Sequence, residues 1–261
     1  MSKPSQLGTD GKVALSLSLT TMGGFVDAVG YIALFEVFTA NMSGNSIHIG
    51  MYLSQHDWGN FLRPFCAVVS YVVGMLLTRI AVEIAGRRRI TRIASFTFAV
   101  EALLLLFFAR ATPAMHLGQI VDLHSPAYFG LVAVMAFAMG VQTATLTHVG
   151  ALTIYTTFVT GTLTKMTESA TRALFWAVDE LPQTSISHVV RNAAAQKDVR
   201  EGAMLVAVWT AYVLGAASGA FAKSRWELRA LYFPVAVLIG FIFLDRFRPI
   251  DVEEAKKQTG A

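Results

Sequence analysis

Charged side chains are scarce in this sequence. Only 15% of its 261 residues are Asp, Glu, Lys or Arg, whereas soluble domains carry roughly 25%, and 54% are hydrophobic with a mean hydropathy of +0.54. A soluble protein with a wholly buried helical core fits this composition poorly, because such a protein still needs a charged surface. The composition indicates an integral, all-α membrane protein.

Cysteine is almost absent. The single residue of this type, Cys66, lies in an apolar run, so a disulfide within the chain and a metal site built from cysteines are both excluded. The net charge of +4 and the isoelectric point near 9.3 do not indicate nucleic acid as a partner. The basic residues flank apolar runs, which is where cytoplasmic loops of membrane proteins concentrate them.

Catalytic motifs are also missing. The sequence contains no HExxH, no GxSxG and no Gly-rich phosphate loop, and its six His residues are scattered. An intramembrane hydrolase using Asp27 and His48 is the enzymatic alternative, but no nucleophile and base are paired. His116, Asp122 and His124 share a loop, yet three ligands of undefined geometry do not define a metal site. We therefore predict that the protein is no enzyme and holds no cofactor or metal.

Apolar runs of about the 20 residues that cross a bilayer recur along the chain. The first is longer than the core of a signal peptide and has no small-residue cleavage pattern, so we expect it to be retained as a span. We expect about six transmembrane helices: Val13–Phe35, Phe61–Ala85, Ile93–Ala109, Pro126–Val149, Ala203–Ala222 and Tyr232–Leu244.

Two short stretches interrupt this apolar pattern: Phe38–Asn45 (FTANMSGN) and, 117 residues later, Tyr155–Thr162 (YTTFVTGT). Each carries Gly and hydroxyl side chains where a membrane helix would carry Leu. Such residues are weak helix formers whose side chains compete for backbone hydrogen bonds, so Ser43–Asn45 and Thr160–Thr162 are expected break points. We expect two short polar helices at membrane depth, either re-entrant or broken.

The two stretches belong to a longer repeat. Gly23 matches Gly140 at the same offset of 117 residues, and the segment 71–74 (YVVG) recurs 141 residues later at 212–215 (YVLG). The difference between the offsets, 24 residues, equals the length of a polar insertion at 177–200. The sequence therefore predicts two repeated halves, with the insertion in the cytoplasm.

The distribution of Lys and Arg chooses between topologies. With six spans, the N-terminus, the cluster Arg87–Arg92, the insertion and the C-terminal tail share one side and carry most of the basic residues, as expected of the cytoplasmic side. Eight spans would place the N-terminus, insertion and tail outside. Three spans per half is an odd number, so we expect two inverted membrane repeats, residues 1–125 and 126–261, with both termini cytoplasmic.

Polar groups within this plan point to a binding site. Broken helices bring free backbone groups and helix dipole ends to the membrane midplane, where they can hold a solute. The alternative is that Gly and Thr serve only as close-packing residues between helices. The candidate residues are Asp27, Asn41, Ser43, Gly44, Asn45, His48, Gln142, Thr157, Thr160, Gly161, Thr162 and Lys165.

Three acidic residues lie inside predicted spans, where each requires an account. Glu83 lies four residues from Arg79 near the inner end of its span, which suits a structural pair or snorkelling side chains. Asp27 shares a helix face with several glycines and is expected to face the bundle interior. It would either form a static ion pair with Lys165 or act as the acid that couples transport to protons or cations. Glu101 lies in a Leu- and Phe-rich span, and its direction cannot be read from the sequence.

Four motifs resemble those of one family: Gly24–Ala28 (GFVDA), Val37–Asn45 (VFTANMSGN), Gly140–Ala144 (GVQTA) and Thr156–Thr164 (TTFVTGTLT). Together they resemble the YoaK family of bacterial membrane proteins over most of the chain. The sequence departs from the family pattern at Ser43, where Thr is usual, and at Thr143, where Asn is usual. The resemblance implies a protein of the bacterial inner membrane, in an uncharacterised family often described as small-molecule permeases, and it supplies no substrate.

The expected function is transport of a small solute along a central path lined by the two polar stretches, within the lipid bilayer. The competing class is a non-transporting membrane scaffold or sensor, in which the stretches only pack. A hydrated cavity between Gly44 and Gly161 would favour transport, and tight packing there would favour the scaffold. The GxxxG face Gly215–Gly219 could serve within one chain or between chains, so a homo-oligomer is an open alternative.

Overall fold

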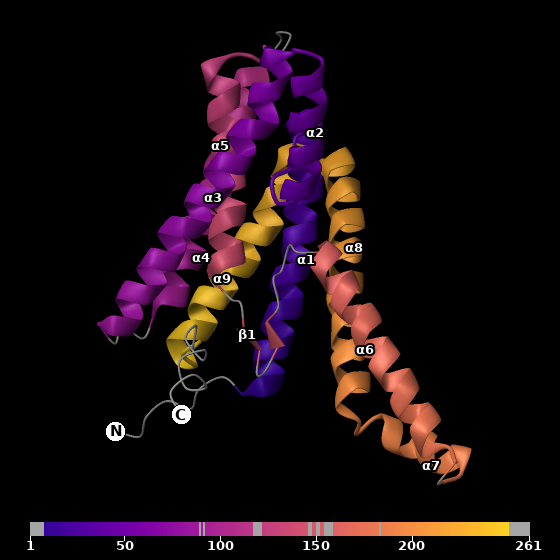
Figure 1. The fold of residues 1–261 in the computed structure, drawn as a ribbon. Coiled ribbons are helices and arrows are strands. Elements are labelled where there is room, and N and C mark those ends of the chain that lie inside the picture. Colours follow the sequence, from indigo (N-terminus) through magenta and orange to yellow (C-terminus); the bar gives the residue numbers. More distant parts are fainter. Residues whose placement is uncertain are drawn as a thin grey trace.

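The computed structural model describes residues 8–88, 90, 92–116, 122–145, 148–149, 152–153, 159–182 and 184–250 (Figure 1). These residues are almost entirely helical, as the sequence predicts. A short antiparallel hairpin of β1 (His148–Val149) and β2 (Leu152–Thr153) follows α5. The helices are α1 (Thr9–Ala33), α2 (Met42–Ser54), α3 (Trp58–Arg87), α4 (Ile93–His116), α5 (Pro126–Thr145), α6 (Val159–Glu180), α7 (Ile186–Ala193), α8 (Lys197–Trp226), the 3₁₀ helix η1 (Glu227–Leu231) and α9 (Tyr232–Phe247).

Five helical stretches in the described part of the chain are long and apolar enough to cross a membrane. Four of them correspond to α1, α3, α4 and α5. The fifth, Lys197–Phe247, contains α8, η1 and α9, which the sequence predicts as two separate spans. The chain reverses at Glu227, which has a φ of 51°, so α8 and α9 run in opposite directions (Figure 1). The fifth and sixth predicted spans, Ala203–Ala222 and Tyr232–Leu244, therefore lie together in this one stretch, within α8 and α9.

The first polar stretch lies at a break between two helices. α1 ends at Ala33, and the connection 34–41 begins with two residues of positive φ, Phe35 (51°) and Glu36 (69°). The connection then returns along α1 until Thr39 contacts Gly30. From there α2 runs in the same direction as α1 and packs on α3 (Figure 1). The stretch is therefore part of a broken helix and not a re-entrant hairpin.

The predicted break points lie at helix starts. Ser43–Asn45 occupy the first turn of α2, and Thr160–Thr162 occupy the first turn of α6. The prediction of breaks inside these triplets is therefore wrong. Polar side chains are favoured at the N-terminal end of a helix because they satisfy free backbone N–H groups there, so the same composition that weakens a helix interior also starts a helix.

α1 and α8 form a parallel pair whose backbones approach very closely. A Cβ atom at Gly24 would overlap the carbonyl oxygen of Tyr212, and a Cβ at Gly215 would overlap that of Thr21. Gly219 meets the backbone of α1 in the same way. The GxxxG face of α8 thus serves within the chain, where small residues allow close helix packing in a membrane.

α3 and α5 form a second parallel pair with the same kind of contact. A Cβ at Gly140 would overlap the carbonyl oxygen of Tyr71, and a Cβ at Gly74 would lie 2.5 Å from that of Phe137. α4 packs against α5 and α9, and η1 contacts α4 as well as α1 and α8, which joins the two pairs. Buried apolar side chains such as Phe98, Met135 and Leu238 fill this central region.

α6 and α7 extend away from this centre in Figure 1. α6 packs on α8, with Ser169 facing Gly202 and an ion pair of 2.6 Å between Arg172 and Asp198. The polar insertion 177–200 comprises the end of α6, all of α7 and the start of α8. It lies at the same end of the molecule as the start of α1 and the end of α3 (Figure 1).

Candidate functional site

The carboxylate of Asp27 joins three parts of the fold. Its Oδ1 accepts hydrogen bonds from the backbone N–H of Thr39 (2.8 Å), the hydroxyl of Thr39 (3.0 Å) and the N–H of Ala40 (2.7 Å). Its Oδ2 accepts one from the hydroxyl of Tyr212 on α8 at 2.8 Å. Asp27 is buried, and four donors stabilise its charge without a cation. It holds the broken connection against both α1 and α8.

The predicted ion pair between Asp27 and Lys165 is wrong. Lys165 is exposed on α6, and the partners of Asp27 in the described residues are Thr39, Ala40 and Tyr212. The four hydrogen bonds account for the carboxylate at membrane depth, so no ammonium group is needed to offset its burial. The proposed coupling role of Asp27 stays a prediction.

Asn41 and Asn45 satisfy the backbone around the break. Asn41 caps α2, since its Oδ1 accepts from the N–H of Gly44 (3.3 Å) and the hydroxyl of Ser43 (2.8 Å). Asn45 is fully buried and bonds twice to Phe38: its Nδ2 donates to the carbonyl at 2.8 Å, and its Oδ1 accepts from the N–H at 3.0 Å. Both amides are committed to local structure, while Ser43 stays exposed.

An aromatic row borders this connection. The ring of Phe38 lies 4.4 Å from that of Tyr31 and 6.3 Å from that of His48, which is followed by Tyr52 at 6.2 Å. Gly44 lies beneath Phe38, where a Cβ would come within 2.7 Å of the ring. His48 is therefore half-buried among rings, and glycine at position 44 leaves room for the aromatic side chain.

Gln142 lies on α5 in the protein interior. It is fully buried, and its Nε2 donates to the carbonyl of Leu19 on α1 at 2.7 Å. The adjacent Thr143, where the family pattern has Asn, accepts a hydrogen bond of 2.9 Å from the hydroxyl of Tyr71 and donates one of 2.8 Å to the carbonyl of Met139. A hydroxyl at position 143 thus joins α3 to α5.

The second polar stretch is described from Val159 onward, and Thr157 lies outside the described residues. Thr160 is exposed, Gly161 is half-buried and Thr162 is buried. α6 and α8 are antiparallel, and Ser169 faces Gly202. Thr162 lies seven residues before Ser169 on α6, which corresponds to about seven residues after Gly202 on α8. Thr162 is therefore at about the height of Trp209, one turn from Tyr212.

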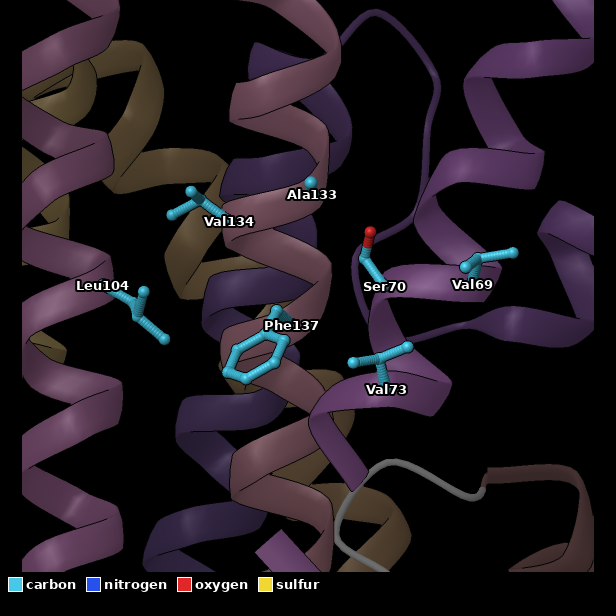
Figure 2. Close-up of a pocket in the computed structure, with 7 residues that line it drawn as sticks. All are labelled: Val69, Ser70, Val73, Leu104, Ala133, Val134 and Phe137. Atoms are coloured by element: carbon cyan, nitrogen blue, oxygen red, sulfur yellow. The ribbon is translucent and has the colours of Figure 1, made fainter. Parts of the chain in front are cut away.

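One face of α6 is polar and open. Its side chains border a hollow of about 570 Å³ and are spaced three and four residues apart, as expected for one side of a helix: Thr164, Thr167, Glu168, Thr171 and Arg172. A second hollow, of about 290 Å³, lies between α3, α4 and α5 and is almost wholly apolar (Figure 2). Val69 and Val73 at its edge are exposed, which suits contact with lipid rather than with a polar solute.

Arg63 is a functional candidate that sequence reasoning missed. It is buried, and its guanidinium donates to the carbonyls of Leu34 (3.5 Å) and Phe35 at the end of α1. The hydroxyl of Tyr128 accepts from Arg63 Nε at 3.2 Å and donates to the Leu34 carbonyl at 2.7 Å. A cation at a helix C-terminus stabilises the helix dipole. In the sequence, Arg63 resembles any other basic residue near the end of a span, and only the structure shows which groups it binds.

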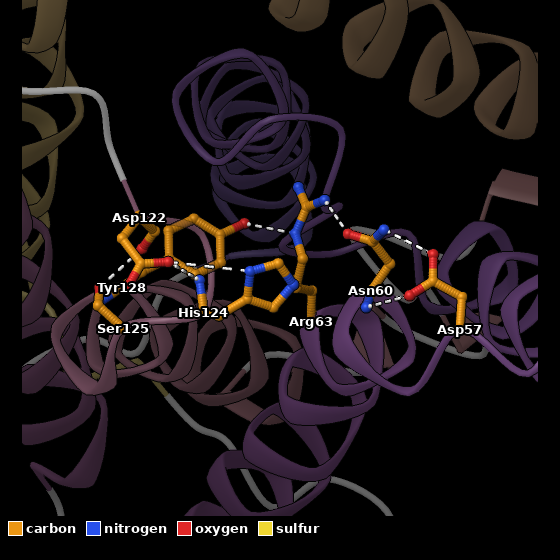
Figure 3. A network of polar contacts seen from close by, with 7 residues as sticks. All are labelled: Asp57, Asn60, Arg63, Asp122, His124, Ser125 and Tyr128. Atoms are coloured by element: carbon orange, nitrogen blue, oxygen red, sulfur yellow. Dashed lines mark hydrogen bonds and ion pairs between the residues drawn. The ribbon is translucent and has the colours of Figure 1, made fainter.

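The same network continues along the first turn of α3 (Figure 3). Arg63 Nη1 donates to Asn60 Oδ1 at 3.1 Å, and Asn60 bonds to Asp57 through its N–H (3.1 Å) and its Nδ2 (2.7 Å). These bonds from Asn60 hold the pKa of Asp57 below its usual range. The end of α1, the start of α3 and the start of α5 are thus fixed together.

Comparison with known proteins identifies a family for this chain. A family model described as "Protein of unknown function (DUF1275)" matches residues 15–244. This chain belongs to the DUF1275 family. It is 28% identical over 199 residues to "UPF0700 transmembrane protein YoaK" of Bacillus subtilis (strain 168), which covers 74% of this chain and 81% of that protein. No solved structure matches.

The motif resemblance to YoaK is therefore confirmed, and the DUF1275 protein is a multi-pass membrane protein with a bacterial homologue. The matched region begins in α1 and ends in α9. It contains Asp27, Tyr212, Arg63 and both polar stretches. The family description assigns no activity, so the function has to be argued from the geometry.

Proposed function

We propose that this DUF1275 protein moves a small solute across the bacterial inner membrane, along a path that passes the starts of α2 and α6. The observation that carries this proposal is the break between α1 and α2, which Asp27 binds inside the candidate span Asp10–Ala33. Non-helical backbone is tolerated at that depth only where it is buried in protein or lines a water-filled cavity. Transporters of several folds bind solutes where broken helices meet.

The second polar stretch supports the same path. The start of α6 lies about one turn from the height of Tyr212, and Tyr212 is bonded to the connection that leads into α2 through Asp27. The N-terminal end of each helix carries partial positive charge, which suits an anionic or strongly polar group on the solute. Ser43 and Thr160 are exposed in the first turns of α2 and α6, so their hydroxyls are the first choice for contacts.

We infer that the two halves, 1–125 and 126–261, arose by duplication and are inverted. The helix contacts support this inference, since Gly24 and Gly140 each meet a Tyr carbonyl, that of Tyr212 or of Tyr71. α1 and α5 run in opposite directions (Figure 1). These contacts pair Gly24 with Gly140, one residue away from the match with Gly23 that the sequence offset suggests.

The proposed topology places both termini in the cytoplasm. The start of α1, the end of α3, the polar insertion and the end of α9 lie at one end of the molecule (Figure 1). These are the places where Lys and Arg are concentrated in the sequence, including Lys12, Arg87 and Arg246. An excess of basic residues is typical of cytoplasmic loops, so this end is assigned to the cytoplasm.

A non-transporting scaffold is the second candidate, and one observation favours it. Asn45 binds the backbone of Phe38 with both ends of its amide, and Oδ1 of Asn41 caps α2. The amide of Asn45 is therefore available to a solute only if the break rearranges. In a scaffold the break would be rigid and dry. No reaction is proposed, and the expectation that the protein is not an enzyme stays a prediction.

Cysteine accessibility in membranes distinguishes the two. In a Cys66→Ala background, single variants Ser43→Cys and Thr160→Cys are treated with a membrane-impermeant thiol reagent from each side. We expect both to react and some solutes to slow the reaction. The exposed Gln55→Cys at the far end of α2 serves as a positive control, and Leu76→Cys, exposed on the apolar face of α3, serves as a negative control.

The controls fix what each result means. Reaction at Ser43 and Thr160 from opposite sides, with Leu76→Cys silent, is the pattern of a water-filled path. If Gln55→Cys reacts while neither Ser43→Cys nor Thr160→Cys does, the path is absent and the scaffold is the better account. A side preference of Gln55→Cys for the periplasmic reagent would support the proposed topology, and the reverse preference would contradict it.

A further inference from the structure

Glu101 is a buried acid without a partner. It lies in the middle of α4, inside the candidate span Ile93–Ala111, and is 0% exposed. Neither of its carboxyl oxygens has a hydrogen-bond partner in the part of the chain that the structure describes. Asp27, another acid in a candidate span, receives four hydrogen bonds. The two acids therefore differ in their hydrogen bonding: Asp27 has four donors, and Glu101 has none among the described residues.

A third orphan oxygen belongs to Gln142. Its Oε1 is buried and has no partner among the described residues, while its Nε2 is fixed on the Leu19 carbonyl. That bond sets the orientation of the amide, so the carbonyl end is the one left to accept. Within the described part of the chain, the buried side-chain atoms without partners are all acceptors: Oε1 and Oε2 of Glu101 and Oε1 of Gln142. Among the described residues, none donates a hydrogen bond to these three oxygens.

The helix register places Glu101 and Gln142 close in height. Leu104 of α4 lines one hollow with Val134 and Phe137 of α5 (Figure 2), and the two helices run in opposite directions (Figure 1). Three residues back from Leu104 is Glu101, whose level on α5 is therefore near Ala138. Gln142 follows about one turn further along α5.

Nearby charges do not supply the missing donor. None of the titratable groups on the elements packed against α4 bonds to Glu101. On α9 and η1 these groups are Tyr232, Asp245, Arg246, Glu227 and Arg229. On α3 and α5 they are Arg63, Cys66, Tyr71, Arg79, Glu83, Arg87 and Tyr128. Asp245 accepts instead from Ser95 and from the N–H of Ile250, and Glu227 pairs with Lys223.

We propose that Glu101 carries an exchangeable proton in the membrane core and donates it, as a hydrogen bond, to Oε1 of Gln142. An ionised carboxylate with no partner is very unfavourable in a region from which water is excluded. Protonation removes the charge and converts one orphan acceptor into a donor, which satisfies a second. A single proton thus satisfies two of the three oxygens, whereas a static carboxylate leaves all three unsatisfied.

The proposed proton extends the proposed transport function by naming its coupling ion and its carrier. It places the exchangeable proton on Glu101, whereas Asp27, which receives four hydrogen bonds, holds the break. Its test detects the proton itself and needs no solute, so failure of this test leaves the solute path standing. A negative result in the cysteine test would likewise not contradict the proposal that Glu101 is protonated.

The experiment is infrared spectroscopy of the full-length protein in lipid vesicles at neutral pH. We expect a C=O stretch of a protonated carboxyl that is absent in E101Q, persists in D27N and shifts when H₂O is replaced by D₂O. In Q142L the band is expected to move to the frequency of a weaker hydrogen bond. Because a protonated acid and an amide are both neutral and similar in size, E101Q is expected to keep wild-type abundance.

Four results would overturn the proposal. They are a spectrum without a Glu101-dependent band, a band that is insensitive to D₂O, a band unchanged in Q142L, and a band that disappears when Na⁺ replaces K⁺, since the last identifies a metal cation in the site. E101D guards against a variant that fails to fold. It keeps the acid with a shorter side chain, so it is expected to keep a protonated carboxyl band at a shifted frequency.

Discussion

Tyr212 on α8 donates a hydrogen bond of 2.8 Å to the carboxylate of Asp27 on α1, across 185 positions of the sequence. The bond closes the contact between the first and the penultimate long helices. It also leaves Oδ1 of Asp27 for the connection that leads into α2. The integrity of the break therefore depends on a side chain near the other end of the chain.

Removing that hydroxyl should weaken the α1 and α8 pair. Tyr212→Phe loses a hydrogen bond to a charged group and is expected to cost about 1.5–3 kcal/mol of unfolding free energy. Tyr71→Phe is the matched control, because it loses a neutral hydrogen bond to Thr143 and should cost about 0.5–1.5 kcal/mol. Denaturant unfolding in mild detergent measures both. Equal losses would contradict an ionised Asp27.

Asp27→Asn should fold, because the amide can keep the geometry. Its Oδ1 can accept from Thr39 and Ala40, and its Nδ2 can donate to the Tyr212 oxygen. Membrane abundance is expected to stay near the wild-type level, with a lower melting temperature from the loss of charge-assisted bonds. Asp27→Leu leaves the same donors unsatisfied and should be poorly expressed. Quantitative blotting and thermal unfolding check both variants.

The close approach of α1 and α8 should make Gly24 far less tolerant of substitution than Gly130. Gly24→Ala forces a methyl group against the Tyr212 carbonyl and is expected to cost about 1–3 kcal/mol. Gly130→Ala, at an open position on α5 with nothing near its Cβ, should instead gain up to about 1 kcal/mol of helix stability. Effects of the same sign in unfolding experiments would argue against the α1 and α8 contact.

The cap at the start of α3 should respond to acid. The folded-state pKa of Asp57 is lowered, chiefly by hydrogen bonds from Asn60. The cap therefore adds stability above the unfolded Asp value of about 3.9 and loses it as the pH falls through the folded-state pKa. Hydrogen-exchange protection of the Asn60 amide is expected to fall on acidification. Asp57→Asn keeps a good cap and should remove this pH dependence.

The fold class could be read from the sequence with good fidelity. Low charge and long apolar runs predict the helices, and the Gly and Thr of the two stretches mark where α2 and α6 begin. The reason is that lipid imposes one strong rule, the internal satisfaction of backbone polar groups, and composition reports directly on that rule. The reversal at Glu227 could also be anticipated, because the charged residues Lys223, Arg225 and Arg229 separate two apolar runs.

The roles of individual polar side chains could not be read in the same way. Asn41 and Asn45 have the composition of solute ligands, yet they bind the backbone of their own segment. Amides and hydroxyls serve both purposes, and only the partner distinguishes them. The roles of Arg63 and Glu101 could not be predicted for a related reason. Arg63 binds carbonyls at the end of α1, and Glu101 has no hydrogen-bond partner among the described residues. Neither arrangement produces a recognisable pattern in the sequence.

The pairing of α1 with α8 has a consequence for synthesis. The first helix enters the membrane with a carboxylate and a glycine face that find their partner only when residues near 212 have been made. Until then Asp27 lacks one of its donors, and the Gly24 surface has no helix to meet. The packing of α1 therefore cannot be completed before α8 is made, and a nascent chain released earlier would expose this surface to the insertion and quality-control machinery.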